Sequence, residues 1–314
     1  MNLRLAPAAE RAKSLVSALF PPKVRNILKA VWVVLVTVFV VRYMVRNWGS
    51  ITDVFRSFSV AVLAGTVAVT IIGKVVISVH SQLITKVNGR EFTFRESFWM
   101  YSASDLVKYV PGGLWNALAR VRLYTNMGMS GTASTKAFAL EKYWMVLGAL
   151  ATGALALTPD GLKALGVSDA VVTVSVTRVL LCAAWVVLIW AGGRLTGNAV
   201  VAGAVARSMV EQSVMAVFLG LGVWIPLQAV DANVSPLVAI GAFSLGRGLG
   251  YAAVFAPAGI GVREAVTLWA IGPTDTTTRA VIVALAVNRV MTFVADVTSF
   301  GLSFTVKPRP NGDT

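Results

Sequence analysis

The sequence predicts an all-α, polytopic inner-membrane protein with about six full spans and two re-entrant broken-helix hairpins, arranged as inverted repeats. Hydrophobic residues make up 56% of the 314 positions and charged residues only 13%, which is far more apolar than an average water-soluble domain. The apolar residues also form blocks of about 20, the length that crosses roughly 30 Å of hydrocarbon. These observations favour a single transmembrane domain over residues 30–305.

Short basic segments flank this domain. Residues 1–29 carry six Lys and Arg and no apolar core, so they predict a cytoplasmic surface segment rather than a cleavable secretion signal. Residues 306–314 are predicted to form a cytoplasmic tail. The formal net charge of +14 could suggest nucleic acid, but basic loops beside membrane spans are expected from orientation alone. We therefore predict no nucleic-acid partner.

Six apolar stretches have the length of full spans, and two further apolar regions are interrupted. The full spans are 30–45, 58–84, 138–157, 171–192, 199–225 and 280–305. Region 97–121 is interrupted at Pro111, Gly112 and Gly113, and region 237–271 at Pro257, Gly259 and Gly261. Because proline removes a backbone donor and glycine permits positive φ, each region is predicted to form two half-helices joined by a loop. A single kinked span in each region is the alternative.

The basic residues between spans favour the re-entrant arrangement. If both interrupted regions return to the side they left, the cytoplasmic segments hold 15 Lys and Arg, six in residues 1–29 and nine beyond. The opposite side then holds four: Arg46, Arg56, Lys163 and Arg279. This asymmetry agrees with the positive-inside rule. Counting both regions as full spans turns the basic loop 121–136 outward and agrees less well.

This topology gives the two halves of the chain opposite orientations. Repeat one, about 30–158, and repeat two, about 171–305, each consist of two spans, a broken hairpin and a further span. Glu141 follows Pro111 by 30 residues, and Asn288 follows Pro257 by 31, so the spacing also matches. Inverted repeats with discontinuous helices are used by secondary transporters for alternating access.

Ionised residues inside the apolar segments need a partner or water, because an isolated charge in hydrocarbon is costly. Arg207 and Glu211, four residues apart, are predicted to pair on one helix face. Lys74 and His80 are predicted to line a polar surface or to bond between helices.

The remaining charges gather at the two breaks and on the last span, where Arg289, Thr292 and Asp296 form one polar stripe. Free N–H groups at a half-helix N-terminus, reinforced by basic side chains, suit a phosphate. The alternative is that these charges only pair with one another and hold the hairpins against the spans. The candidate substrate-binding residues are Lys108, Tyr109, Trp115, Asn116, Arg120, Glu141, Lys142, Arg247, Arg263, Glu264, Arg289 and Asp296.

The sequence offers little for metal or nucleotide chemistry. Cys182 is the single cysteine and His80 the single histidine, so neither a disulfide nor a zinc-type cluster is expected. No GxxxxGK[ST] motif is present to bind a nucleotide. We predict no cofactor and no enzymatic activity. A membrane enzyme that acts on a lipid phosphate, with Asp105, Glu141, Glu264 or Asp296 as acid or base, is the alternative.

Four stretches resemble a known family. They are KYVPGGLWNALAR (108–120), ALEKYWMVLG (139–148), FAPAGIGVREA (255–265) and ALAVNRVMTFVAD (284–296). Together they resemble the lysylphosphatidylglycerol synthetase transmembrane-domain family, the flippase portion of bacterial lipid-aminoacylating proteins. The most specific parts are the Tyr-x-Pro-Gly and Pro-x-Gly-x-Gly-Val-Arg-Glu motifs, which occur in order with the intervening spans. The resemblance covers about residues 30–305.

The resemblance implies lipid translocation in the bacterial inner membrane. It marks seven motif positions: Lys108, Arg120, Glu141, Lys142, Arg263, Glu264 and Arg289. Lys142 departs from the pattern, since many relatives carry arginine there, and no soluble synthetase domain follows Thr305. Because the chain has no lipid-modifying domain of its own, a polyprenyl-phosphate-linked sugar is favoured over an aminoacyl phospholipid as the translocated lipid.

We therefore predict a flippase for an anionic lipid that works by alternating access. Lys108, Arg120, Arg263 and Arg289 are the expected phosphate partners. Glu141, Glu264 and Asp296 are the expected counter-ions, and Tyr109, Trp115 and Asn116 the expected head-group contacts. A glycosyltransferase, recruited through the basic N-terminal segment, is a further candidate partner. The oligomeric state is left open.

Overall fold

The computed structural model describes Arg56 and residues 58–109, 115–156, 174–195, 202–253, 259 and 261–307. Within these ranges the regular secondary structure is helical and no strand occurs, as the sequence predicted. The predicted span 30–45 lies outside the described residues. So do Pro111, Gly112, Gly113 and Pro257 of the two breaks.

Three of the described helices are long and apolar enough to cross a membrane. They are α4 (Val60–Val87), α10 (Ala202–Ala229) and the greater part of α13 (Asp275–Thr305). At about 1.5 Å per residue, the 28 residues of α4 extend ~42 Å, more than the hydrocarbon thickness of roughly 30 Å. By their length and composition, these helices fit a membrane protein.

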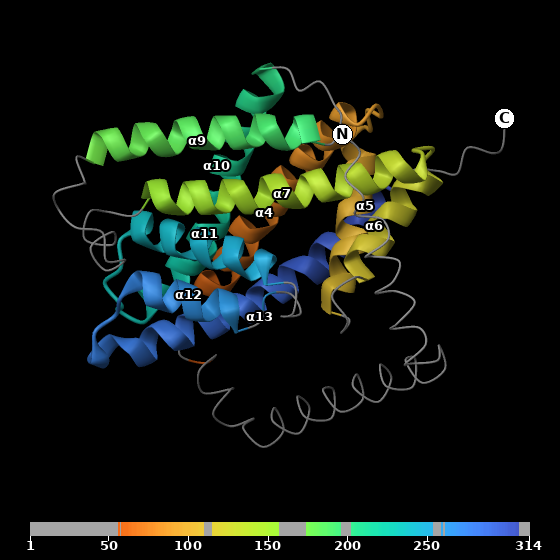
Figure 1. Cartoon of the computed structure of the whole chain (residues 1–314). Coiled ribbons are helices and arrows are strands. Elements are labelled where there is room, and N and C mark those ends of the chain that lie inside the picture. The colour runs from red at the N-terminus through yellow and green to blue at the C-terminus, as the bar shows by residue number, and fades with distance from the viewer. Residues whose placement is uncertain are drawn as a thin grey trace, which may run out of the picture.

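The helices form a layered bundle (Figure 1). α7 (Gly131–Ala156) lies between α9 (Val174–Leu195) and α11 (Pro236–Ala252), and it packs against both. α12 (Val262–Ile271) lies between α11 and α13. α4 packs along α10, and α13 packs against both of these helices.

Both interrupted regions contain two helices, as predicted from their proline and glycine residues. In the first region, α5 (Phe94–Asp105) continues into the short 3-10 helix η1 (Leu106–Tyr109), and α6 (Trp115–Asn126) follows the break. In the second region, α11 ends at Ala252 and α12 begins at Val262. α5 packs against α6 and α11 against α12, so neither region forms one kinked helix.

Local capping groups fix where the half-helices begin and end. Thr93 and Glu96 form a reciprocal capping box at the start of α5. At the start of α12 the Glu264 carboxylate accepts the N–H of Gly261 at 2.9 Å, and Gly261 has a φ of 85°, which favours glycine. Gly272 ends α12 in the left-handed conformation. The Glu264 side chain is therefore held at the second break by the backbone that it caps.

Small residues allow the helix backbones to approach one another closely. A Cβ atom added to Gly220 on α10 would lie 2.5 Å from the Cα atom of Ile240 on α11. A Cβ atom on Gly73 of α4 would lie 2.7 Å from the side chain of Leu219 on α10. Membrane helices associate through such contacts, because lipid gives them no hydrophobic drive to pack.

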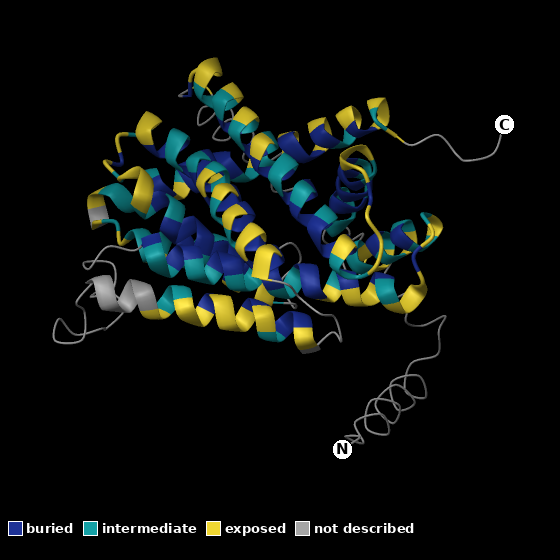
Figure 2. Ribbon diagram, turned by 90° about the horizontal axis from the view of Figure 1, so that it is seen from above, coloured by how far each residue is buried: buried dark blue, intermediate teal, exposed yellow. Residues whose placement is uncertain are grey.

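Buried residues gather inside the bundle, and exposed residues lie on the outer sides of the helices (Figure 2). Buried apolar side chains such as Ile84, Leu140 and Trp144 form one core between α4, α7 and their neighbours. Large apolar side chains remain exposed on the outside, among them Val187 and Val210. Such an exterior suits contact with hydrocarbon.

Candidate functional site

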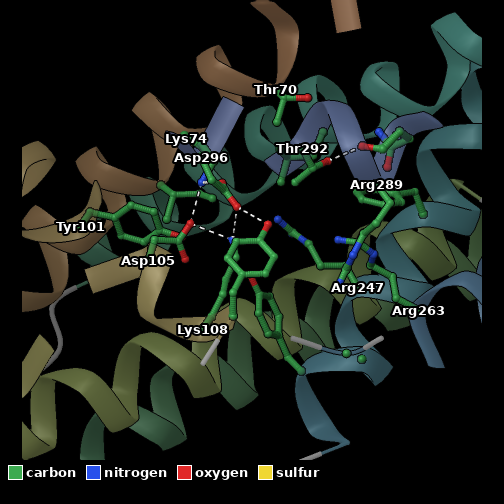
Figure 3. Close-up of a pocket in the computed structure, with 18 residues that line it drawn as sticks. Thr70, Lys74, Tyr101, Asp105, Lys108, Arg247, Arg263, Arg289, Thr292 and Asp296 are labelled. Carbon is green, nitrogen blue, oxygen red and sulfur yellow. Dashed lines mark hydrogen bonds and ion pairs between the residues drawn. The ribbon is translucent and has the colours of Figure 1, made fainter. Parts of the chain in front are cut away.

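A pocket of about 70 Å³ lies where α4, α5, η1, α10, α11, α12 and α13 meet (Figure 3). Its described lining contains five basic residues, Lys74, Lys108, Arg247, Arg263 and Arg289, and two acidic residues, Asp105 and Asp296. Hydroxyl and amide groups complete the polar lining: Thr70, Tyr101, Tyr109, Tyr251, Asn288 and Thr292. The pocket is therefore rich in charged side chains although apolar helices contribute to it.

Four charged side chains at one end of the pocket form a closed ring of ion pairs (Figure 3). Lys74 Nζ lies 2.6 Å from Asp105 Oδ2 and also contacts Asp296 Oδ1. Lys108 Nζ lies 2.9 Å from Asp105 Oδ2 and 2.7 Å from Asp296 Oδ2. The Tyr109 hydroxyl donates to Asp296 Oδ2 at 2.6 Å. Each lysine thus contacts both aspartates, and the four charges cancel.

The ring joins elements that are distant in the sequence. Lys74 comes from α4, Asp105 and Lys108 from α5 and η1, and Asp296 from α13. The Asp296 side chain is 0% exposed and that of Lys74 only 6%, so water does not screen their interaction. Removing one member of such a buried pair would leave an uncompensated charge. The ring therefore fixes α13 against the first interrupted region.

Arginine residues occupy the other end of the pocket, beside the second break. Arg263 Nη2 lies 3.1 Å from Glu264 Oε1, and Arg289 Nη1 lies 3.5 Å from the same oxygen. The Arg263 guanidinium also lies over the ring of Phe243, 5.2 Å from its centroid. Because Glu264 caps α12, the helix backbone holds this carboxylate in place, and Glu264 in turn orients two guanidinium groups.

Arg247 is the most unusual side chain of the pocket. It comes from α11, is 4% exposed, and lies among the pocket residues with Arg263 and Arg289 (Figure 3). None of its three guanidinium nitrogens has a hydrogen-bond partner among the described residues. A buried charged group without partners is costly, so such a group indicates that a ligand or water completes the site.

α13 presents a polar and an apolar stripe side by side. Arg289, Thr292 and Asp296 line the pocket. A second stripe lies about 100° away around the helix axis, because each residue turns the helix by this angle. This stripe is apolar and exposed, and it consists of Val290, Phe293, Val294 and Val297. The ring of Phe293 packs edge-on against that of Tyr109, with centroids 5.1 Å apart. The polar pocket therefore borders a surface that suits a hydrocarbon chain.

A second charged cluster is fully enclosed between α4, α5, α6 and α7. Arg120 and Glu141 are both 0% exposed, and Arg120 Nη1 lies 3.2 Å from Glu141 Oε2. Arg120 Nε donates to Ser104 Oγ at 2.6 Å, and Ser81 and Tyr124 donate to Glu141. This cluster has its own complete set of partners, and neither Arg120 nor Glu141 lines the pocket.

A third cluster links α4 to α10. Arg207 Nε lies 2.7 Å from Glu211 Oε1, which confirms the pair expected from their spacing. The other oxygen of Glu211 lies 3.0 Å from His80 Nδ1, so His80 bonds between helices, as predicted. This cluster also lies outside the pocket lining.

Neither the protein-family models nor the curated proteins that were compared with this sequence give a match. The resemblance to the lysylphosphatidylglycerol synthetase transmembrane-domain family therefore stays a prediction.

The structure brings about half of the predicted site residues together. Lys108, Tyr109, Arg247, Arg263, Arg289 and Asp296 line the pocket with Gly259, and Glu264 contacts two of these arginines. The remaining candidates lie elsewhere. Trp115 is exposed, the Asn116 amide donates to the Ser104 carbonyl at 2.9 Å, and Lys142 Nζ lies 3.3 Å from Glu141.

Sequence reasoning left two central residues out of the candidate set. Lys74 was predicted only to line a polar surface or to bond between helices. Asp105 was counted among the charges at the first break and as a possible acid or base, but not as a substrate-binding residue. Both belong to the ion-pair ring. The available signal was a lysine in the interior of span 58–84 and an aspartate three residues before Lys108.

Proposed function

We propose that this chain is a flippase that moves the phosphate-bearing head group of an anionic lipid across the bacterial cytoplasmic membrane. The observation that carries the proposal is the buried Arg247 guanidinium, which has no hydrogen-bond partner among the described residues and shares a pocket with two further arginines. A phosphate oxyanion accepts bidentate hydrogen bonds from a guanidinium. Removal of water from the arginines is then compensated by the ligand.

A phosphate loses its hydration shell when it enters hydrocarbon. In this proposal the guanidinium groups of the arginines take the place of that water. Arg247, Arg263 and Arg289 bind the head group, and the N-terminal end of α12, next to Gly259 and Arg263, adds partial positive charge. The lipid tail stays in the bilayer along the exposed apolar stripe of α13. The lipid leaves chemically unchanged, and no enzymatic step is involved.

The proposed transport cycle uses six full spans and two re-entrant hairpins, in two inverted repeats with both chain ends cytoplasmic. The pocket supports this scheme because it takes residues from both parts of the chain: Lys74 and Lys108 precede residue 158, and Arg247 and Arg289 follow residue 171. Rocking of one part against the other would expose the pocket to each leaflet in turn.

A proteoliposome assay tests the proposal. The purified chain is reconstituted with a fluorescent polyprenyl-phosphate-linked sugar or an aminoacyl phospholipid, the two lipids suggested by the sequence, and the fraction that reaches the opposite leaflet is measured. We expect movement of a phosphate lipid above protein-free liposomes, and loss of this movement in Arg247→Gln. The control Lys136→Gln removes the same charge from an exposed position of α7 and should keep the activity. Background movement of every phosphate lipid, or chemical change of the lipid in mass spectrometry, would refute the flippase.

A further inference from the structure

The two ends of the pocket differ in net charge. In the ring, two lysines face two aspartates, so this end is neutral. At the other end three arginines of the described lining are accompanied by the single carboxylate of Glu264, which leaves two positive charges. The undescribed residues of the two breaks, 110–114, 254–258 and 260, contain no ionisable side chain and do not change this count.

Lys142 adds to the excess of positive charge. It shares Glu141 with Arg120, so these three residues carry a net charge of +1. The Lys142 ammonium also lies over the ring of Tyr251, a residue of the pocket, 5.6 Å from its centroid. The surroundings of the arginine end therefore carry an excess of at least two positive charges. Such an excess at a buried site is unfavourable unless an anion of similar charge binds there.

We infer that this anion is a phosphate monoester at the end of a lipid, rather than a phosphodiester. A monoester carries about −1.5 to −2 charges near pH 7 and has three terminal oxygens. A diester carries one negative charge and has two terminal oxygens, so it would leave at least one positive charge without a partner. The inference rests on the proposed function and narrows its substrate class.

The donors at the arginine end suit three terminal oxygens. Arg247 alone has five N–H groups, none of them used by a hydrogen bond within the described part of the chain. Arg263 and Arg289 bring further guanidinium groups from α12 and α13, so three helices each supply one. Guanidinium groups bind phosphate oxygens in pairs, so three of them provide enough donors for all three terminal oxygens.

The pocket has room for the phosphate group of a monoester. A volume of about 70 Å³ holds several water molecules, at roughly 10–15 Å³ each, and so matches one compact phosphate group. The pocket is partly open, so its volume sets no upper limit on the head group. Charge therefore carries the choice of a lipid monophosphate over the sugar-linked phosphate favoured by the sequence. The exposed apolar stripe of α13 beside the pocket favours a lipid over free phosphate.

Binding to the full chain in detergent tests the inference. Isothermal titration compares dodecyl phosphate, its methyl ester and inorganic phosphate at pH 7.5. We expect the monoester to bind about tenfold or more tightly than the methyl ester, because one additional ion pair forms in a poorly screened site. Arg247→Gln should abolish the preference, whereas Arg247→Lys, which keeps the charge, and Lys136→Gln should retain it. Equal binding of the monoester and the methyl ester would overturn the inference. If inorganic phosphate binds as tightly as dodecyl phosphate, the bound anion is not specifically a lipid phosphate.

The pH dependence supplies a second measurement. The monoester loses its second proton with a pKa of about 6, so the preference of the site for the monoester over the methyl ester should shrink between pH 7.5 and 5.5. The charged groups that face the phosphate are Arg247, Arg263, Arg289 and Glu264, with the ion-pair ring opposite them. Protonation of any of these groups would make the site more positive and would favour the more highly charged monoester, so it does not account for a falling ratio. A ratio that stays constant over this range would contradict the inference.

Transport measurements separate this inference from the proposed function. Proteoliposomes are loaded with short-chain fluorescent phosphatidic acid, a monoester, or phosphatidylglycerol, a diester. Faster movement of phosphatidic acid supports both proposals. If the two lipids move at equal rates, the preference for a monoester is refuted and the flippase proposal stands. If the monoester binds tightly but does not move, the flippase proposal is refuted and the monoester-binding site stands.

Discussion

The enclosed pair of Arg120 and Glu141 allows a direct test of whether a buried charge serves structure or substrate. Both side chains are 0% exposed, and their hydrogen-bond partners come from four different helices. Glu141→Gln leaves the Arg120 guanidinium buried without its counter-charge, which costs about 3–5 kcal/mol when one partner of a buried pair is removed. Arg120→Met should cost a similar amount. The double variant Arg120→Met with Glu141→Gln should cost less than the sum of the two, by about 0.5–3 kcal/mol, because neither position then holds a buried charge that has lost its partner.

The assay is denaturant unfolding of the purified chain in detergent, followed by tryptophan fluorescence. Wild type, both single variants and the double variant form a double-mutant cycle, and lipid movement is measured on each in parallel. We expect strong destabilisation of both single variants and partial recovery in the double variant. Single variants that unfold like wild type but no longer move lipid would refute the structural interpretation. They would indicate that Arg120 takes part in substrate binding. Strictly additive losses would show that the two charges do not depend on each other.

Three further predictions concern packing, the ring and the second break. Gly220→Ala should lower the thermal midpoint, because its Cβ would lie 2.5 Å from the Ile240 backbone, whereas Gly203→Ala on the same helix meets nothing within 4 Å and should not; equal midpoints would contradict this. Asp296→Asn should lower the midpoint by the equivalent of roughly 3 kcal/mol, since two lysines lose a shared carboxylate, and an unchanged midpoint would argue against the ring. Gly259→Ala should cost about 1–2 kcal/mol at a φ of 66°, measured by denaturant unfolding; a neutral effect would show that the backbone can relax there.

Features set by near neighbours in the sequence were predictable. Proline and glycine interrupt a helix wherever they occur together, so the two breaks could be located within a few residues. The stripe of Arg289, Thr292 and Asp296 follows from helical periodicity, and all three residues do line the pocket. The pair of Arg207 and Glu211 needs only a spacing of four on one helix.

Partners that come from distant helices were not predictable. Lys74 contacts Asp105, 31 residues away, and Asp296 near the other end of the chain. Which charge meets which depends on how each helix is rotated about its axis, and apolar packing decides this rotation. Arg120 shows the same limit. On α6 it lies on one face with Asn116 and Tyr124, and this face turns towards α5 and α7 rather than to the pocket.

The ion-pair ring also constrains how the proposed flippase can move. Lys74, Asp105 and Lys108 belong to the N-terminal part of the chain and Asp296 to the C-terminal part, so both pairs of Asp296 cross between the parts. Any motion that draws α13 away from α4 and η1 must break both pairs at once. The separated charges would remain in a poorly hydrated interior, at a cost of several kcal/mol.

That cost depends on what enters the pocket as it opens. Water, or the phosphate of a bound lipid, can take over the two lysines that Asp296 releases, and the barrier to opening then falls. A ligand shifts such an equilibrium only through its different affinity for the two states, and contact with the released lysines provides that difference. On the proposed mechanism, the arginine end therefore selects the anion, and the ring makes the opening of the pocket depend on its presence.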